Sequence, residues 1–357
     1  MMMKTNSSKQ TLFIGSYASS DAAGIYGGVF EVDTGNLTIH SSFTGIANPS
    51  FVLGHPNGRF LYSVSEIGMA SDGQHGAVWA FRIGDDLTLD PINQQSTQGD
   101  WPCHLAIDGT GRWLIASNYG SGDAALFPLL PDGSLGPLQT LMRHQGSGPN
   151  KDRQEGPHAH SATFSPDNRF VIIADLGIDQ LVVYAFDAEV GALVKQAEVQ
   201  ANPGAGPRHL AFGPNGRFLY AANELDNTVT VYRYDAANGS LSSIQTIPTL
   251  PAPNPDSAVA DIHFSPSGQH LYVSNRGHNS VAVFGVGADG RLTSIGFPSC
   301  GGNWPRNFAV GGNGRYLLVA NRHTNNIAIL PLTAAGPNVQ DPIQQTTISQ
   351  PSCVQFI

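Results

Sequence analysis

One short stretch, which the chain repeats, decides the fold. At residues 207–220 it reads PRHLAFGPNGRFLY, and at residues 49–62 it occurs as PSFVLGHPNGRFLY. Both versions consist of a short apolar strand, a Pro-Asn-Gly-Arg turn and a second apolar strand. Less similar copies begin at Pro102, Pro157, Ala258, Pro305 and Pro351. A unit that recurs at regular intervals indicates a repeat architecture, and this must be weighed before any other fold.

Seven copies of the unit follow each other 46 to 57 residues apart. One position of the repeat is occupied, from the first copy to the last, by Ser50, Cys103, His160, Arg208, Ala260, Arg306 and Ser352. The copy that starts at Pro207 holds four segments rich in β-branched and aromatic residues, at 210–212, 218–222, 228–234 and 240–247. Four strands per unit and seven units are typical of a seven-bladed β-propeller. We therefore predict an all-β fold with four antiparallel strands in each blade.

The two ends of the chain complement each other. The last copy holds a single strand, residues 353–357, whereas the segment 11–15 near the N-terminus matches the second strand of a unit. We expect these terminal strands to pair within one blade, which hides sheet edges that would otherwise favour aggregation. Residues 1–10 are then a disordered tail, and residues 11–357 form one propeller domain. Two β-sandwich domains would not explain why a shifted start matches a truncated end.

Composition excludes several classes of function. The formal net charge is −9 and only 13% of residues are charged, which argues against a broad nucleic-acid-binding surface. No apolar run approaches the roughly 18 residues of a membrane span, and the polar first ten residues do not resemble a signal peptide. The three cysteines form no CxxC motif, which favours a reducing compartment. We expect a cytoplasmic protein, a monomer or weak homodimer, without nucleic-acid or membrane partners.

Comparison of the units separates structural positions from chemical ones. The turn between the first two strands keeps an arginine in several units, which assigns that arginine to the blade itself: Arg59, Arg112, Arg217 and Arg315. Two other positions change sharply in residue type. They carry His160, Arg208 and Arg306 at the start of the first strand, and Glu66, Glu224, Arg276 and Arg322 just after the second.

Both variable positions are expected at the same mouth of the propeller. The first strand of each blade lines the central channel and the second strand runs antiparallel to it, so the start of one lies beside the end of the other. Several arginines around a polar cavity bind carboxylate or phosphate groups through paired hydrogen bonds. A histidine and a glutamate among them supply acid–base chemistry. The sequence therefore predicts a site for a small anionic substrate.

An insertion at residues 141–156 precedes the third-blade histidines and makes one repeat step the longest. We expect this segment to form a lid or a wall of the site, with Arg153 in contact with substrate. The pair His158-x-His160 could bind a metal ion, but no acidic ligand accompanies it, so we expect neither metal nor cofactor. No GxSxG elbow, P-loop or dinucleotide-binding fingerprint is present.

Five motifs carry a resemblance to a known family: Gly156-Pro157-His158-Ala159-His160, Pro207-Arg208-His209, Asn223-Glu224-Leu225, Ala260-Asp261-Ile262-His263 and Ser274-Asn275-Arg276. Together they resemble the lactonase family of seven-bladed propellers, which includes propeller-type 6-phosphogluconolactonases and fungal-type carboxy-cis,cis-muconate lactonizing enzymes. The resemblance covers essentially the whole chain. It implies an active site of one histidine, two arginines and one glutamate, which fall on His160, Arg208, Arg276 and Glu224. His158 competes with His160 for the histidine role.

The resemblance implies a lactonase, and we expect it to hydrolyse 6-phospho-D-glucono-1,5-lactone in the pentose phosphate pathway. Either His160 or Glu224 is the general base, while Arg208 and Arg276 stabilise developing charge. The expected substrate-binding residues are His158, Arg306, Arg322, Glu66 and Arg153, with Arg306 and Arg322 as phosphate ligands. The alternatives are cycloisomerisation of a carboxymuconate, hydrolysis of another sugar lactone, or a propeller scaffold that binds a protein partner.

Overall fold

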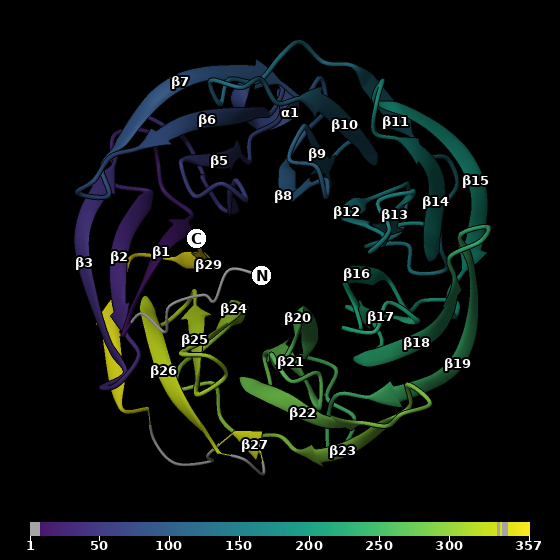
Figure 1. The fold of residues 1–357 in the computed structure, drawn as a ribbon. Coiled ribbons are helices and arrows are strands. Elements are labelled where there is room, and N and C mark those ends of the chain that lie inside the picture. The colour runs from purple at the N-terminus through teal and green to yellow at the C-terminus, as the bar shows by residue number, and fades with distance from the viewer. Residues whose placement is uncertain (1–7, 334–335, 338–341) are drawn as a thin grey trace.

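Radial β-sheets surround a central channel in the computed structural model, which describes residues 8–333, 336–337 and 342–357 (Figure 1). The described residues form seven antiparallel sheets. Six sheets have four strands, and the seventh has a main path of four with one further strand beside it. The predicted all-β seven-bladed propeller is therefore confirmed.

From the channel outward, the first four blades consist of β29 (Pro351–Phe356), β1 (Lys9–Ser16), β2 (Ile25–Glu31) and β3 (Asn36–Phe43); β4 (Val52–Gly54), β5 (Phe60–Ser65), β6 (Ala77–Ile83) and β7 (Leu89–Ser96); β8 (Pro102–Ile107), β9 (Trp113–Asn118), β10 (Asp123–Pro128) and β11 (Thr140–Arg143); β12 (Ala159–Phe164), β13 (Phe170–Asp175), β14 (Gln180–Asp187) and β15 (Ala192–Gln200).

The other three blades consist of β16 (Pro207–Phe212), β17 (Phe218–Asn223), β18 (Thr228–Asp235) and β19 (Ser240–Pro248); β20 (Ala258–Phe264), β21 (His270–Arg276), β22 (Ser280–Val286) and β23 (Leu292–Gly296); β24 (Pro305–Gly311), β25 (Tyr316–Asn321) and β26 (Asn326–Thr333), with both β27 (Gly336–Pro337) and β28 (Gln344–Thr347) paired to β26. One short helix, α1 (Met69–Asp72), lies between β5 and β6. No helix among the described residues is long and apolar enough to cross a membrane.

The two ends of the chain close the ring, as the sequence predicts. Strand β29 pairs antiparallel with β1, and Leu12 lies opposite Phe356 and Gly15 opposite Cys353. Strand β1 begins at Lys9, so the predicted boundary between tail and propeller is two residues too late. Residues 1–7 of that predicted tail lie outside the described residues.

The blades adhere through apolar layers between neighbouring sheets. Phe218 and Tyr220 of β17, for example, pack in one cluster with Val259 of β20 and Leu271 of β21. All six residues of β17 are buried, because both faces of this sheet are covered. The outermost strands instead mix exposed and covered positions, as in β19. This difference explains why the second strand of each unit reads as a continuous apolar run.

The recurrent turn arginines pack against the blades. Arg59, Arg169 and Arg217 each lie over the ring of the phenylalanine that follows, with 5.4, 5.5 and 5.6 Å from the guanidinium carbon to the ring centre. The predicted structural role of this position is thus consistent with its contacts. The turn on the other side of a blade uses glycine, as at Gly239, whose φ is 73° and where a Cβ would come within 2.6 Å of Phe170.

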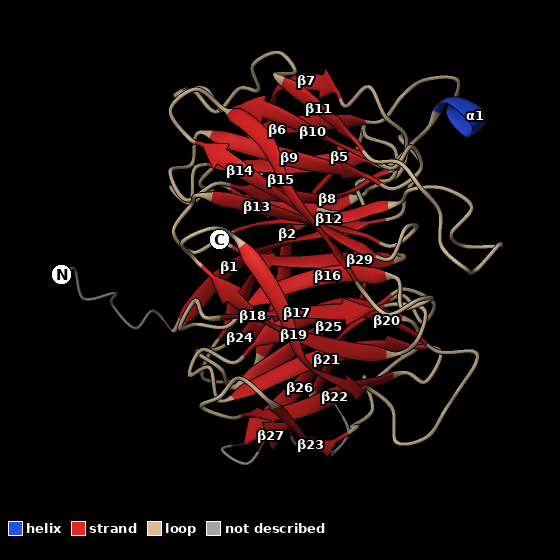
Figure 2. Cartoon of the chain, turned by 90° about the vertical axis from the view of Figure 1, so that its right-hand side faces the viewer, coloured by secondary structure: helices blue, strands red, loops and turns tan. Residues whose placement is uncertain are grey.

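Every innermost strand starts at one face of the disc, and every second strand ends there. Pro207 at the start of β16 pairs with Asn223 at the end of β17, and Ala258 pairs with Arg276 in the next blade. Helix α1 marks this face in Figure 2, and the C-terminus marks the opposite one. We call the α1 face the mouth, because the candidate site lies there.

Candidate active site

A cavity of about 230 Å³ lies at the mouth, where the two variable repeat positions meet. Its lining combines three guanidinium groups, two carboxylates, an imidazole, a thiol and three aromatic rings. The lining residues are Tyr17, Glu66, Trp101, Cys103, Tyr119, Arg153, His160, Glu224, Arg276 and Arg306. Most of the residues that the sequence singles out therefore converge on one small polar cavity.

Glu224 is the centre of the charge network. Its Oε1 accepts a hydrogen bond from Arg153 Nη2 at 2.6 Å, and its Oε2 accepts one from Arg208 Nε at 2.9 Å. Arg276 Nη2 forms an ion pair with the same Oε2 at 2.8 Å. Three guanidinium groups from separate segments are thus held by one carboxylate that is 3% exposed.

The network fixes the charge of Glu224. Burial by itself would raise the pKa of this carboxyl group, but Arg276, Arg208 and Arg153 outweigh burial and hold the pKa well below its usual range. A carboxylate in this state is a poor proton acceptor. Burial and the charges of Arg276 and Arg306 lower the pKa of Arg208 to about 10, so Arg208 remains charged at neutral pH.

Arg208 lies behind the cavity and acts through its neighbours. Its side chain is 2% exposed, and it spends its donors on Glu224 and on the backbone oxygen of Ala260. Arg276 lines the cavity, donates to the backbone oxygen of Val259, and lies 5.5 Å from the ring centre of Trp304. The two predicted catalytic arginines therefore differ in access to a substrate.

His160 is a neutral imidazole in the cavity wall. Burial and the nearby positive charge of Arg208 hold its pKa well below the ordinary value. The Cys103 thiol donates to the His160 backbone oxygen at 3.4 Å, and its sulfur lies 3.6 Å from Nδ1. A proton on Nδ1 that faces the sulfur leaves Nε2 as the acceptor, 4.0 Å from Glu224 Oε2. This arrangement suits a general base.

A second cluster binds Glu66 at the other side of the cavity. Tyr17 donates its hydroxyl hydrogen to Glu66, with both carboxylate oxygens within 3.0 Å, and Ser50 also donates to Glu66. Arg306 lies 3.9 Å from Glu66 Oε2 and 5.1 Å from the Tyr17 ring centre. Arg322 stacks on the same ring at 4.1 Å. The Tyr17 ring therefore carries two guanidinium groups.

Two predicted substrate-binding residues lie outside the cavity lining. His158 uses both ring nitrogens, Nδ1 at 2.8 Å from the backbone oxygen of Tyr119 and Nε2 at 3.1 Å from Glu155 Oε1. Its ring stacks on Tyr119 at 4.5 Å. Of the two competing histidines, the structure thus places His160 and not His158 at the cavity. Arg322 reaches the site through Tyr17, while its Nε and Nη2 donate to Gln350.

The insertion between β11 and β12 forms a wall of the site. Gln154 anchors it, since this fully buried side chain donates to the backbone oxygen of Leu176 and to Asp179. The neighbouring Arg153 side chain, 40% exposed, reaches into the cavity to Glu224 and to the Tyr119 hydroxyl group. The anchor and the reaching arginine agree with the predicted wall.

Four lining residues were not selected from the sequence. Tyr17 and Tyr119 occupy the same repeat position as Glu66 and Glu224, and Cys103 occupies the position of His160, so the repeat alignment contained the signal. We weighed charge above aromatic and sulfur groups and passed over them. Trp101 has no such signal, although its left-handed backbone (φ 54°) just before Pro102 marks an unusual conformation.

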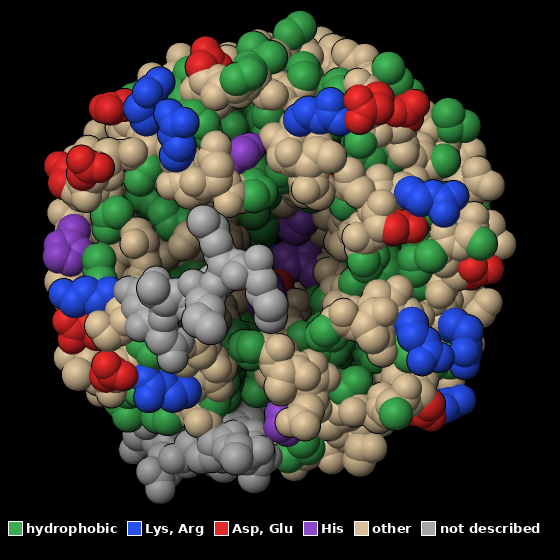
Figure 3. All heavy atoms as spheres, in the orientation of Figure 1, with side chains coloured by type: hydrophobic (Ala, Val, Ile, Leu, Met, Phe, Trp, Pro, Cys, Tyr) green, Lys and Arg blue, Asp and Glu red, His purple; other side chains and the backbone are tan. Residues whose placement is uncertain are grey.

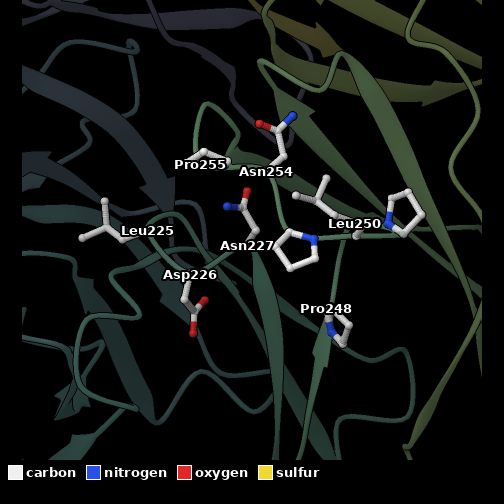
Figure 4. A pocket seen from close by; sticks show the side chains of 10 residues that line it. Leu225, Asp226, Asn227, Pro248, Leu250, Asn254 and Pro255 are labelled. Atoms are coloured by element: carbon white, nitrogen blue, oxygen red, sulfur yellow. The ribbon is translucent and has the colours of Figure 1, made fainter.

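Another cavity, of about 450 Å³, lies between the turn at Leu225–Asn227 and the proline-rich segment after β19. Figure 4 shows proline rings and leucine side chains around the amides of Asn227 and Asn254, and no arginine or histidine lines it. Larger volume does not outweigh the missing acid–base and anion-binding groups, so the mouth cavity is the candidate active site. No group of three or more His, Cys, Asp or Glu side chains in the described part of the chain could hold a metal ion.

Comparison with known proteins gives one consistent result. The family model described as "Lactonase, 7-bladed beta-propeller" matches residues 11–356. A 6-phosphogluconolactonase of Bacillus subtilis is 33% identical over 97% of both chains, and one of Formosa agariphila is 33% identical over 97% of this chain and 99% of its own. The solved structure of a periplasmic gluconolactonase from Pseudomonas aeruginosa superposes with a TM-score of 0.92 at 31% identity, over 98% of this chain and 99% of the other.

Proposed function

The chain belongs to the lactonase family of seven-bladed β-propellers, and from that premise we propose that it hydrolyses 6-phospho-D-glucono-1,5-lactone to 6-phosphogluconate. The observation that carries the proposal is the mouth cavity, in which a neutral histidine lies beside a carboxylate held by three guanidinium groups. The names of the relatives supply the substrate class.

Hydrolysis of a lactone requires a proton acceptor for water and a donor for the carbonyl oxygen. We assign the first role to His160, because Glu224 is held as a carboxylate of low basicity. Arg276 is the donor to the developing oxyanion, since it lines the cavity and keeps its charge there. Glu224 and Arg208 position Arg276 and Arg153 and do not exchange protons with the substrate.

The proton balance closes without a cofactor. Water adds to the carbonyl carbon while one of its protons passes to His160. The bond from that carbon to the ring oxygen then breaks, and the proton moves from His160 to the ring oxygen, which leaves as a hydroxyl group. The new carboxylic acid ionises at neutral pH and stays close to Arg276 and Arg153 until release.

The phosphate is assigned to Arg306 and Arg322, which share the Tyr17 ring. Glu66 holds Tyr17 in place, and Arg306 already lines the cavity. Guanidinium groups suit phosphate because they donate two parallel hydrogen bonds. By the same reasoning His158 supports Tyr119 and takes no direct part in binding.

One observation favours a second candidate, glucono-1,5-lactone without phosphate. The Pseudomonas aeruginosa protein, described as a gluconolactonase, covers this chain almost completely. Arg322 also already has a partner in Gln350. If phosphate is not recognised, Arg306 and Arg322 only support Tyr17.

The decisive experiment compares freshly prepared 6-phosphogluconolactone, gluconolactone and a muconolactone, with spontaneous hydrolysis subtracted. We expect the highest kcat/KM with the phosphorylated lactone. The variants Arg306→Gln and Arg322→Gln should raise KM for that substrate and leave gluconolactone hydrolysis nearly unchanged. Equal kcat/KM for both sugar lactones would replace the proposal by the gluconolactone reading, and turnover of the muconolactone alone would replace it by cycloisomerisation.

Location and assembly follow the same proposal. Cys103, Cys300 and Cys353 are all unpaired and buried, which is compatible with the cytoplasm that we propose. We further propose that the propeller works as a monomer or a weak homodimer, because its mouth cavity takes every lining residue from one chain.

A further inference from the structure

A second ring of polar side chains lies one residue further along the innermost strands. The residues that follow Cys103, Arg208, Ala260 and Arg306 are His104, His209, Asp261 and Asn307. This second ring borders another cavity, of about 290 Å³, whose walls continue along the same strands to Phe212, Phe264 and Gln355, away from the mouth. Figure 3 views the face opposite the mouth and shows histidine side chains deep in the central hollow.

Asp261 organises the second ring. Its Oδ1 accepts from His209 Nδ1 at 2.7 Å, and its Oδ2 accepts from His263 Nε2 at 2.8 Å, from Asn307 at 2.5 Å and from the Phe308 backbone N–H at 3.2 Å. These donors hold the pKa of Asp261 well below its usual range, although burial alone would raise it. The hydrogen bond from His209 fixes its proton on Nδ1 and leaves Nε2 as a bare acceptor.

Two nitrogen atoms of the second ring remain without a partner among the described residues. The buried Nδ1 of His104 has no hydrogen bond, and His209 bonds through Nδ1 and not through Nε2. Burial lowers the pKa of His209 to about 4 and also lowers that of His104, so both rings are neutral. Buried polar nitrogens are rarely left unsatisfied, and a polar cavity of this size has room for water molecules.

The second ring touches the candidate base. The ring centre of His209 lies 5.5 Å from that of His160 and 5.1 Å from that of His104. His160 lines the mouth cavity and His209 lines the cavity behind it. The pair therefore forms the partition between the two cavities.

We propose that His209, oriented by Asp261, holds the hydrolytic water against His160 from the channel side, opposite to the side from which the lactone enters. This inference rests on the proposed lactone hydrolysis. The water oxygen bonds to the carbonyl carbon, one water proton passes to His160, the bond to the ring oxygen breaks, and His160 returns the proton to that oxygen. His209 accepts a hydrogen bond from the water and neither gains nor loses a proton, so it is a positioning residue. Substrate that fills the mouth then does not block access of water.

The test separates the two nitrogens of His209. In His209→Asn the amide nitrogen can still donate to Asp261, but nothing replaces Nε2. We expect kcat to fall about 10- to 100-fold, because misplacement of a reacting group costs up to about 10²-fold, while KM and the melting temperature stay close to wild type. His209→Gln, whose amide extends toward the Nε2 position, should recover part of kcat. His270→Asn, the same change on a histidine at the opposite end of β21, should change nothing.

A crystal structure at high resolution supplies a readout that does not depend on activity. We expect an ordered water within hydrogen-bond distance of His209 Nε2 in the wild type, and its loss in His209→Asn. Wild-type kcat in His209→Asn, or the absence of that water in the wild type, overturns the inference. If the wild type hydrolyses no lactone, the proposed function fails, whereas the presence or absence of the water still decides whether His209 seats one beside His160.

Discussion

Arginine occupies both ends of the blade formed by β16–β19, under opposite conditions. Arg208 at the mouth is 2% exposed and gives its hydrogen bonds to Glu224 and Ala260. Arg217 in the turn at the other end is exposed and lies over the Phe218 ring at 5.6 Å. Other blades repeat the second arrangement, as with Arg59 and Arg169, whereas Cys103 and Ala260 replace the first.

This contrast shows how a repeat separates stability from chemistry. A turn arginine acts through a contact available in every blade, so selection for folding alone can keep it. A buried arginine is costly unless a carboxylate and further acceptors accompany it. Such a group persists at one position of one blade only if the resulting charge network has a use. The predictions below test this contrast.

The largest effect is expected from Glu224→Gln. The variant removes the charge that holds Arg153, Arg208 and Arg276, and it leaves buried cations without a counter-ion. We expect a loss of about 3–5 kcal/mol in the free energy of unfolding. Because the arginine donors lose their alignment together, kcat/KM should fall about 10³-fold or more, beyond the cost of a single oriented donor. Chemical denaturation and lactonase assays measure the two effects.

Glu189→Gln is the matched control. Glu189 pairs with the turn residue Arg112 at 2.8 Å, and its side chain is 81% exposed. Loss of such a surface pair costs about 0–1 kcal/mol. If both variants behaved alike, the distinction between mouth and turn would be wrong.

Next in size is Arg276→Ala. Arg276 lines the cavity and is our oxyanion donor, so kcat/KM should fall about 10²–10³-fold. Arg276→Lys keeps the charge without the paired geometry and should recover only part of the loss. Steady-state kinetics that change KM alone would instead assign Arg276 to ground-state binding.

Sequence reasoning reached the fold because the repeat is written in local terms. Turn glycines, apolar strand runs and the shifted N-terminus each constrain the blade, and β29 pairs with β1 as expected. His160, Glu224 and Arg276 were also placed at one mouth by the alignment alone. Strand polarity puts them there without any knowledge of side-chain contacts.

The alignment could not reveal how the side chains share their partners. Access separates Arg208 from Arg276, and it depends on the Ala260 backbone oxygen. His158 and His160 are two residues apart, yet only the structure shows that Tyr119 and Glu155 occupy His158. The second ring behind the mouth was likewise not selected, although His209 and Asp261 lie within the family motifs.

A smaller effect concerns pH. Burial, listed with nearby positive groups, lowers the pKa of His104, His160 and His209 in the folded state, so the unfolded chain binds more protons below about pH 6.5. Stability should therefore fall as the pH falls, by about 1–1.5 kcal/mol per histidine between pH 7.5 and 5.5. His263 opposes them, since Asp261 raises its pKa against the effect of burial.

Melting temperatures of the wild type and of His209→Asn at pH 7.5 and 5.5 measure this effect. The variant should lose less stability over that interval than the wild type, because one of the three histidines is gone. An equal loss would mean that His209 is not held neutral by the fold.

The smallest effect is expected from Arg217→Ala. The variant removes the guanidinium group over Phe218, a contact worth about 0.5–1 kcal/mol at an exposed site. Arg233 lies over the same ring at 5.7 Å and remains in place, so the lower end of that range is expected. The double variant Arg217→Ala/Arg233→Ala should lose more than the sum of the two single losses if the two groups substitute for each other. Throughout the series kcat/KM should stay at the wild-type value, since the turn lies at the far end of the blade from the mouth cavity. A catalytic defect in Arg217→Ala without a loss of stability would show that variation between blades does not separate chemistry from folding in this propeller.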